Sequence, residues 1–190
     1  PSQPRLAQRG APHHVADAGS RIGLGHVMRC TALGEAWLAR GGEVVFASSS
    51  VPTELFARLG AEGFATRPLA GPPGAEQDAR DTAALARSCS ADCIVLDGYH
   101  FDSAYRRLLR PAEARVLVIV DGASGDGDGA DFVLDQNLGA ARPGGERHDS
   151  SATRFLLGPR YALLRREFWR WRGRAHAIAP RAGKLLVTLG

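Results

Sequence analysis

The sequence feature that most restricts the fold of this chain is a series of short, unbroken apolar runs that alternate with helix-like segments. The clearest runs read CIVLDG and ARVLVIVDG, and EVVFASS and ADFVLDQN have the same character. Strands that are apolar on both faces are typical of parallel sheets that helices cover on both sides. The sequence therefore predicts an α/β fold, a Rossmann-like parallel sheet with helices on both faces, in which ligands bind at the carboxyl ends of the strands.

Helix signals lie between these runs. Pro52 opens and Gly63 closes one helix-like stretch, AEQDARDTAALARSC has the pattern of a second helix, and Asp102 is a good N-cap for a third. In the helix that follows the loop GSRIGLGH, apolar residues recur at helical spacing and are expected in the core. These residues are Val27, Cys30, Leu33 and Trp37.

The chain divides into three predicted parts. Residues 1–12 contain no apolar segment and are expected to form an irregular or non-native leader. Residues 13–175 form the Rossmann-like domain, whose first strand, HHVADAG, is unusual because it begins with two histidines. Residues 176–190 form a linker and an apolar strand, KLLVTLG, at which a second β-α series would begin. We therefore expect the N-terminal half of a two-domain protein.

Composition excludes several classes of protein. The chain has 190 residues, 44% of them hydrophobic and 23% charged, which is ordinary for a globular protein. No apolar run reaches the roughly 18 residues of a membrane span. The 3 cysteines lack the spacing of a zinc site, so reduced thiols and a cytoplasmic location are expected.

The net charge of +4 comes largely from arginines near the C-terminal end. In segment 160–174 they alternate with Phe168, Trp169 and Trp171, a mixture that favours an amphipathic helix packed on the protein over a nucleic-acid interface. The preceding RFLLG and a turn at Gly158–Pro159 would lead into this terminal helix. A basic balance also suits phosphorylated small molecules, so we expect a small-molecule partner and no nucleic acid.

The opening loop, GSRIGLGHVMRC, has several competing interpretations. Gly23 and Gly25 resemble the start of a dinucleotide fingerprint, but Met28 replaces its third glycine and no acidic residue follows VVFASSS. A P-loop is excluded because no lysine precedes Lys184. A glycine-rich loop that feeds a helix remains, and the N–H groups at such a helix start favour an anion or sugar hydroxyls.

Two side chains at this helix start can carry chemistry. His26 either caps the helix or exchanges a proton near neutral pH. Arg29 points elsewhere and can pair with a carboxylate or a phosphate.

A metal site is not expected from the acidic stretch DGDGAD. It contains Asp126, Asp128 and Asp131, but it lacks the third ligand and the glycine of a calcium loop. A solvated turn is the simpler interpretation, so no metal and no cofactor are expected.

Several blocks of the sequence together resemble one family. DAGSRIGLGHVMRCTALGEAW is similar to the opening of the UDP-sugar hydrolases of pseudaminic acid biosynthesis and of their spore-coat polysaccharide relatives. Later blocks follow in the same order, namely IVLDGYHFD, FVLDQNLGA, LLGPRYALLRREF and LLVTLG. The resemblance covers nearly all of the chain from Asp17 to Gly190.

The resemblance implies a GT-B architecture, in which two Rossmann-like domains face each other across a cleft. The family hydrolyses the bond between the anomeric carbon of a UDP-linked diacetamido-trideoxy sugar and the UDP oxygen, with inversion and without a metal. His26 corresponds to the base that activates water. The nucleotide is expected mostly on the C-terminal domain, which this chain lacks, so the chain alone is expected to be inactive.

Other residues of these blocks are expected to contact the sugar or to order its loops. Asp17 ends the first strand and either orients water or sugar or caps a turn. The further expected substrate contacts are Gly23, Gly25, Arg29, Asp97, Tyr99, His100, Asn137 and Tyr161.

One block departs from the family pattern. The family typically has Asp-His-Tyr-Gly, whereas this chain has Asp97, Gly98, Tyr99 and His100. Positions two apart lie on the same side of an extended segment, so His100 either reaches a similar place or marks a related enzyme with another sugar.

Two other functions stay open at this point. An inverting GT-B glycosyltransferase would use His26 to deprotonate an acceptor hydroxyl, and the loop also resembles the GTGGH loop of lipid-linked sugar transferases. A non-catalytic sugar-binding or regulatory module is the third. Release of UDP with water alone separates the hydrolase from the transferase.

Overall fold

The computed structural model describes residues 13–16, 25–122, 127–141 and 152–175, with single positions at 180, 181, 183 and 187. For residues 13–16 it describes the backbone only. The predicted leader, most of the predicted linker and second-domain strand, and the expected site residues Asp17 and Gly23 lie outside these residues.

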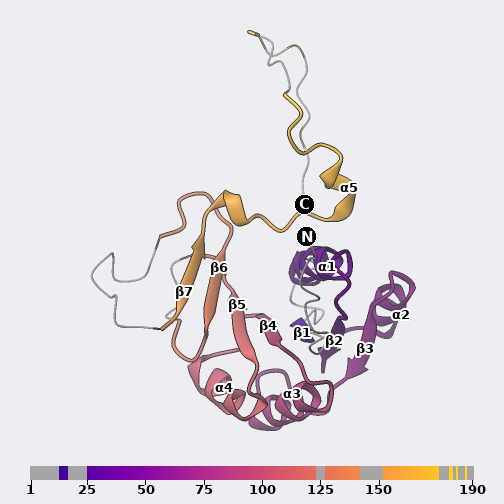
Figure 1. The fold of residues 1–190 in the computed structure, drawn as a ribbon, viewed down its shortest axis with the longest axis vertical. Coiled ribbons are helices and arrows are strands. Elements are labelled where there is room, and N and C mark those ends of the chain that lie inside the picture. Colours follow the sequence, from indigo (N-terminus) through magenta and orange to yellow (C-terminus); the bar gives the residue numbers. More distant parts are fainter. Residues whose placement is uncertain are drawn as a thin grey trace, which may run out of the picture.

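The described residues form a sheet of 7 strands in the order β3-β2-β1-β4-β5-β6-β7 (Figure 1). Every neighbouring pair is parallel. The strands are β1 (His13–Ala16), β2 (Val45–Ser48), β3 (Ala65–Pro68), β4 (Cys93–Asp97), β5 (Arg115–Ile119), β6 (Phe132–Asp135) and β7 (Arg154–Leu157). The order reverses between β1 and β4, where doubly wound sheets bind ligands. The predicted Rossmann-like parallel sheet is confirmed.

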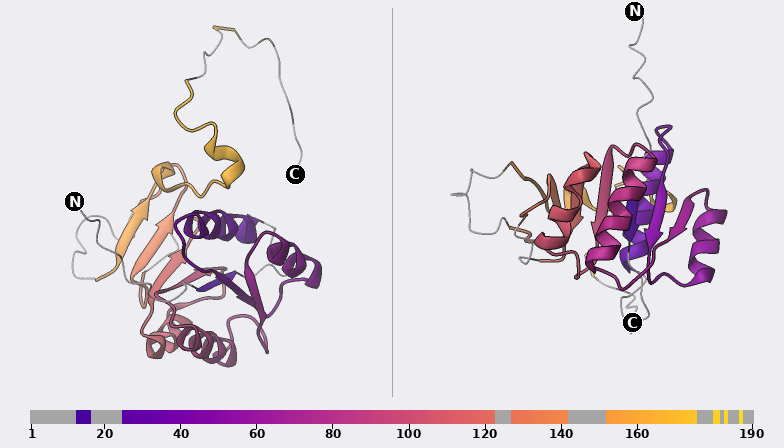
Figure 2. Two further views of the ribbon diagram at one scale, coloured as in Figure 1. Left: turned by 45° about the vertical axis from the view of Figure 1, so that its right-hand side comes forward. Right: turned by 90° about the horizontal axis from the view of Figure 1, so that it is seen from below.

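Helices cover both faces of the sheet, as Figures 1 and 2 show. The helices are α1 (Gly25–Leu38), α2 (Thr53–Ala61), α3 (Glu76–Ser88), α4 (Ser103–Leu108) and α5 (Arg166–Trp169). Helices α1 and α2 pack on one face of the sheet, and α3 and α4 pack on the other.

The two faces explain why the strands are apolar throughout. In β4, Ile94 and Leu96 belong to the hydrophobic cluster under α3 and α4, whereas Val95 belongs to the cluster under α1 and α2. Alternate side chains of a strand point to opposite faces, so a strand buried on both sides needs an unbroken apolar run. Pro68 is tolerated because β3 is an edge strand, where a missing N–H breaks no ladder.

The predicted N-cap of α4 is confirmed. The Oδ1 atom of Asp102 accepts a hydrogen bond of 2.8 Å from the N–H of Tyr105, which leaves the start of α4 satisfied. The cap lies at the end of the loop that connects Asp97, the last residue of β4, to α4.

Two local predictions are wrong. Trp37 is exposed rather than in the core, because its indole covers Gly42 where the chain turns after α1. The predicted terminal helix is only the single turn α5, because tertiary hydrogen bonds hold the preceding residues extended. Leu163 N–H donates to Gln136 Oε1 (2.9 Å) and Arg166 N–H donates to Glu35 Oε2 (2.8 Å).

Candidate active site

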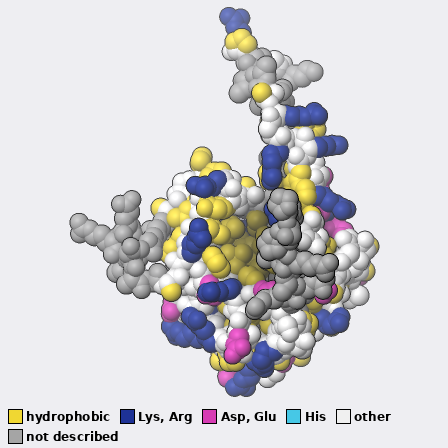
Figure 3. Space-filling view, viewed as in Figure 1, with side chains coloured by type: hydrophobic (Ala, Val, Ile, Leu, Met, Phe, Trp, Pro, Cys, Tyr) yellow, Lys and Arg dark blue, Asp and Glu magenta, His cyan; other side chains and the backbone are white. Residues whose placement is uncertain are grey.

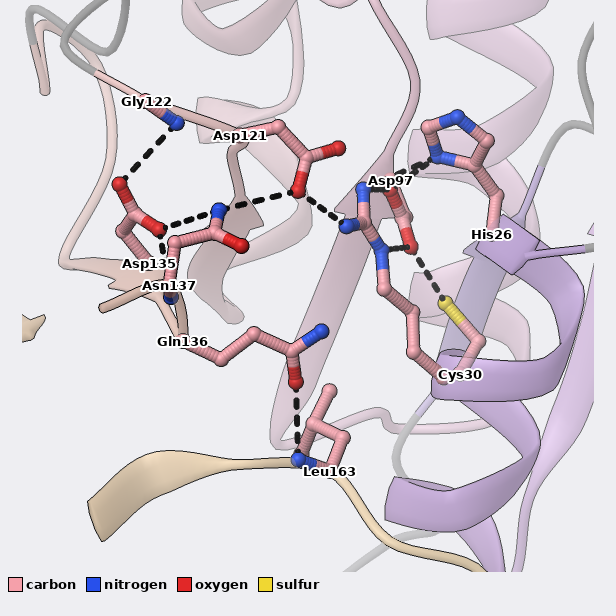
Figure 4. Close-up of polar contacts among 10 residues, drawn as sticks. His26, Cys30, Asp97, Asp121, Gly122, Asp135, Gln136, Asn137 and Leu163 are labelled. Carbon is pink, nitrogen blue, oxygen red and sulfur yellow. Dashed lines mark hydrogen bonds and ion pairs between the residues drawn. The ribbon is translucent and has the colours of Figure 1, made fainter. Parts of the chain in front are cut away.

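The carboxyl ends of three neighbouring strands each place an aspartate at the same edge of the sheet. Asp97 is the last residue of β4 and Asp135 is the last residue of β6. Asp121 follows directly on β5, whose pairing extends to Val120, since the Val120 N–H donates to Leu134 O (2.9 Å). The N-terminal turn of α1 lies beside β4 at this edge, so its side chains meet these carboxylates (Figure 4).

Asp97 is the centre of the arrangement and is fully buried, with 0% exposure. Its Oδ1 lies 2.6 Å from His26 Nδ1, and Arg29 forms a fork on both oxygens, from Nε to Oδ2 (2.5 Å) and from Nη2 to Oδ1 (2.5 Å). The thiol of Cys30 also donates to Oδ2, at 3.6 Å. A buried carboxylate needs such partners, and a forked guanidinium holds it in one orientation.

The contact between His26 and Asp97 determines where the imidazole proton lies. An Nδ1 atom 2.6 Å from a carboxylate oxygen must carry a proton, because two lone pairs would otherwise face each other. Arg29 Nη2 lies 3.0 Å from the same Nδ1 but has Asp97 Oδ1 as its acceptor. In the neutral ring the lone pair is therefore on Nε2, which is the atom that can take a proton from a ligand.

Arg29 connects two carboxylates through one planar group. Its Nη1 donates to Asp121 Oδ1 (2.7 Å), while Nε and Nη2 hold Asp97. Burial alone would lower the pKa of Arg29, but the hydrogen bonds and charges of Asp97 and Asp121 raise it above its ordinary value. Arg29 therefore stays cationic at this edge.

The same ion pair acts on Asp121. The hydrogen bond from Arg29 lowers the pKa of Asp121 below its ordinary value, although partial burial opposes this, and the nearby charge of Arg29 adds to the effect. Asp121 is consequently ionised at neutral pH.

Asp135 braces the loops that follow β5 and β6. Its Oδ2 accepts the Gly122 N–H (3.1 Å), and its Oδ1 accepts both the backbone N–H (3.0 Å) and the side-chain amide (2.9 Å) of Asn137. Gly122 has φ of +85°, a conformation that glycine adopts without strain. Asn137 Nδ2 also approaches Asp121 Oδ1 at 3.4 Å, which joins this brace to the ion-pair network.

Two cavities meet at this network. One, of about 290 Å³, extends toward the start of α4 and is lined by Tyr99, Asp102 and Ser103 among others. The second, of about 470 Å³, lies under the C-terminal segment and is lined by Met28, Gln136, Leu163, Leu164, Arg165 and Phe168 among others. His26, Arg29 and Asp121 line both cavities. In the space-filling view, hydrophobic side chains gather in a hollow over β5, β6 and β7 (Figure 3).

The structure brings together several residues expected from the sequence. His26, Arg29 and Asp97 are in direct contact, and the Tyr99 ring lies 5.4 Å from the His26 ring, edge to face. Tyr99 is 75% exposed and lines the smaller cavity. Asn137 reaches the network through Asp121.

Gly25 begins α1 and lines the larger cavity. A side chain at this position would meet nothing within 4 Å in the described part of the chain. Among the described residues, the space beside Gly25 is therefore open.

His100 and Tyr161 do not line either cavity. The ring of His100 stacks edge to face on Phe101 at 4.4 Å and lies over Gly98, where an added Cβ would be 3.3 Å from its Nε2. His100 therefore lies beside position 98 but does not line the cavities, and neither alternative for its role is decided. Tyr161 packs against the cluster under α1, with the Arg160 guanidinium over its ring.

The sequence analysis missed Asp121, Asp135 and Gln136. Each follows an apolar strand run, as Asp97 does, in the stretches VDG and LDQN. An acidic or amide residue at the end of a buried parallel strand would have been sufficient to find them.

Among the described residues, no group of three or more His, Cys, Asp and Glu side chains is arranged to hold a metal ion. Within the same part of the chain, every helix is too short or too polar to cross a membrane. No protein-family model and no curated protein matches the chain.

Proposed function

We propose that this chain forms the catalytic half of a sugar-nucleotide hydrolase, in which His26 activates the water that displaces UDP from the anomeric carbon of the sugar. The observation that supports this most is the buried contact of 2.6 Å between His26 Nδ1 and Asp97 Oδ1. It occupies Nδ1 and leaves Nε2 as the nitrogen available to a ligand, on a ring that lines cavities large enough for a small molecule. A histidine that only capped the helix would need neither the carboxylate nor the cavities.

The proposed reaction is a single displacement. The water oxygen attacks the anomeric carbon, one water proton moves to His26 Nε2, and the bond from the anomeric carbon to the UDP oxygen breaks with its electron pair on UDP. The configuration inverts because attack and departure occur on opposite faces of the sugar. Asp97 stabilises the imidazolium that forms, as a buried carboxylate does in other histidine-based sites.

The identity of the substrate rests on the resemblance of the sequence blocks to the UDP-sugar hydrolases of pseudaminic acid biosynthesis. We infer that the sugar is a UDP-linked diacetamido-trideoxy sugar and that the product enters nonulosonic acid or surface polysaccharide synthesis in the cytoplasm. We further propose a GT-B architecture in which a second Rossmann-like domain binds the nucleotide. Tyr99 and Asn137 would then contact the sugar from this side of the cleft.

The test uses the full-length protein with this UDP-sugar and no acceptor. We expect His26→Asn and His26→Ala to abolish UDP release, measured by a coupled phosphate or chromatographic assay, while isothermal titration still shows binding. The control is Asp128→Asn, which alters an exposed ion pair with Arg107, and neither of these two residues lines a cavity. UDP release by His26→Asn at the wild-type rate would refute the role of His26.

A second candidate is an inverting glycosyltransferase that uses the same histidine on an acceptor hydroxyl. The larger cavity favours it, because Met28, Leu163, Leu164 and Phe168 provide an apolar surface next to His26. A hydrolase has no need of such a surface, whereas an acceptor with an apolar part fits it. UDP release that depends on an added acceptor would support this candidate over the hydrolase.

A further inference from the structure

Of the three aspartates at the strand ends, Asp121 lines the cavities, whereas Asp97 and Asp135 are not in their lining. The Asp121 side chain is 35% exposed, and it lines both cavities together with His26. Its Oδ1 accepts from Arg29 Nη1 (2.7 Å) and from Asn137 Nδ2 (3.4 Å). Among the described residues, nothing donates a hydrogen bond to its Oδ2, which is the Asp121 oxygen without a dashed line in Figure 4.

We propose that Asp121 is a second catalytic residue, whose Oδ2 accepts a hydrogen bond from the water that His26 deprotonates. This inference rests on the proposed hydrolase function. Asp121 would favour water over other nucleophiles, which His26 alone cannot do.

The chemistry of water explains how a second acceptor contributes. A water molecule carries two protons, and acceptors for both O–H bonds hold a lone pair toward the anomeric carbon in one orientation. His26 Nε2 accepts one of them. The remaining O–H needs an acceptor in the same cavity, and an ionised carboxylate is a strong one.

The frame that holds the two acceptors is rigid. One planar guanidinium, that of Arg29, binds Asp97 through Nε and Nη2 and Asp121 through Nη1. Asp97 in turn holds the His26 ring. The planar guanidinium of Arg29 therefore helps to set the positions of His26 and Asp121 relative to each other.

Asp102 is a weaker candidate for this role, although it lines the smaller cavity. Its Oδ1 is committed to the N–H of Tyr105 as the cap of α4, and the network of Arg29 does not reach it. Asp121 therefore has the better-defined geometry.

The step balances without protonation of Asp121. The proton that moves goes to His26 Nε2, and the electron pair of the broken bond leaves with UDP. The second proton stays on the attacking oxygen and becomes the proton of the new anomeric hydroxyl, with Asp121 Oδ2 as its hydrogen-bond acceptor throughout.

A nucleophile with only one proton should not need Asp121. Methanol has a single O–H, which His26 can accept, so attack by methanol uses the histidine alone. The experiment therefore incubates the full-length protein with the UDP-linked diacetamido-trideoxy sugar in water containing a fixed fraction of methanol. Free sugar and methyl glycoside are then counted by NMR in the wild type and in Asp121→Asn.

We expect Asp121→Asn to lower kcat for hydrolysis by about 10²-fold with little change in KM. The ratio of methyl glycoside to free sugar should rise by about the same 10²-fold, since only attack by water loses an acceptor. Asp128→Asn removes an exposed aspartate of the same kind and should leave both the rate and the ratio unchanged. Both products come from the same protein sample, so partial misfolding does not alter their ratio. Asp121→Ser is a second variant that should raise the ratio in the same direction.

The outcomes separate the two levels of the proposal. A wild-type protein that releases UDP only when methanol or another acceptor is present would overturn the hydrolase function and this inference with it. A wild-type protein that hydrolyses the substrate, with an unchanged product ratio in both Asp121 variants, would overturn the role of Asp121 and leave the hydrolase function in place.

Discussion

Replacement of Asp97 by asparagine is the most direct test of the network at the sheet edge. The carboxylate accepts hydrogen bonds at both oxygens, whereas an amide can accept at one end only. If the amide NH₂ group faces Arg29 Nε, two donors oppose each other. If it faces His26, it donates to Nδ1 and forces the proton of the neutral ring onto Nε2.

The size of the effect on stability follows from these contacts. A hydrogen bond to a charged group contributes about 1.5–3 kcal/mol, and the amide removes at least one such bond from Arg29 together with the charge of Asp97. Arg29 keeps its pair with Asp121, so its charge stays compensated. We expect the free energy of unfolding to fall by about 3 kcal/mol, which a domain with about 5–15 kcal/mol survives.

The effect on catalysis should be larger. With the proton on Nε2, His26 is no longer a base toward the cavity, and we expect kcat to fall by about 10³- to 10⁴-fold, or about 4–5.5 kcal/mol of barrier. The assays are denaturant unfolding and UDP release by the full-length protein. Asp78→Asn is a matched control, because Asp78 is also buried but holds the Gly74 N–H beside α3. Turnover of Asp97→Asn within a few-fold of wild type would refute the dyad.

Two further predictions concern titration. Because Arg29 lowers the pKa of Asp121, their ion pair stabilises the fold above the ordinary aspartate pKa and loses this effect as pH falls through the lower folded value. The stability difference between wild type and Asp121→Asn, followed by thermal unfolding, should therefore shrink below about pH 4, and a difference independent of pH would contradict the pairing. Burial raises the pKa of Cys93 to about 12 and that of Cys30 well above its usual range, so at pH 8 a thiol reagent should modify Cys89 first. Mass spectrometry of the labelled peptides checks this order, and early labelling of Cys30 would contradict it.

The sheet was predictable from the sequence because burial on both faces leaves an unbroken apolar run. β4 and β5 carry such runs, with alternate residues in the two clusters, and this pattern depends only on local sequence. The α4 cap was predictable for the same reason, since Asp102 and Tyr105 are three residues apart. The conformation of segment 160–174 was not predictable from local sequence. Glu35 and Gln136, distant in sequence, bind the amides that a terminal helix would have used.

The candidate site was predictable in part. His26, Arg29 and Asp97 were identified as separate candidates, but their contact spans 68–71 positions of sequence and follows only from the adjacency of β1 and β4. Asp121 was not expected because it belongs to none of the family-like blocks, whereas the feature it shares with Asp97 and Asp135 is an acidic residue at the end of a parallel strand. His100 lies beside Gly98 and packs on Phe101, so it is not in the lining of the cavities, and its role stays a prediction.

The geometry also bears on the choice between hydrolase and glycosyltransferase. The pair of His26 and Asp97 serves either reaction, since water and an alcohol both give one proton to Nε2. The second proton of water distinguishes it from an alcohol, and among the described residues Asp121 is the carboxylate, besides Asp97, that Arg29 binds. An enzyme that must transfer a sugar to an alcohol gains nothing from that carboxylate and would suffer from the competing hydrolysis that it promotes. The presence of Asp121 at this position therefore favours water as the nucleophile, against the apolar lining of the larger cavity.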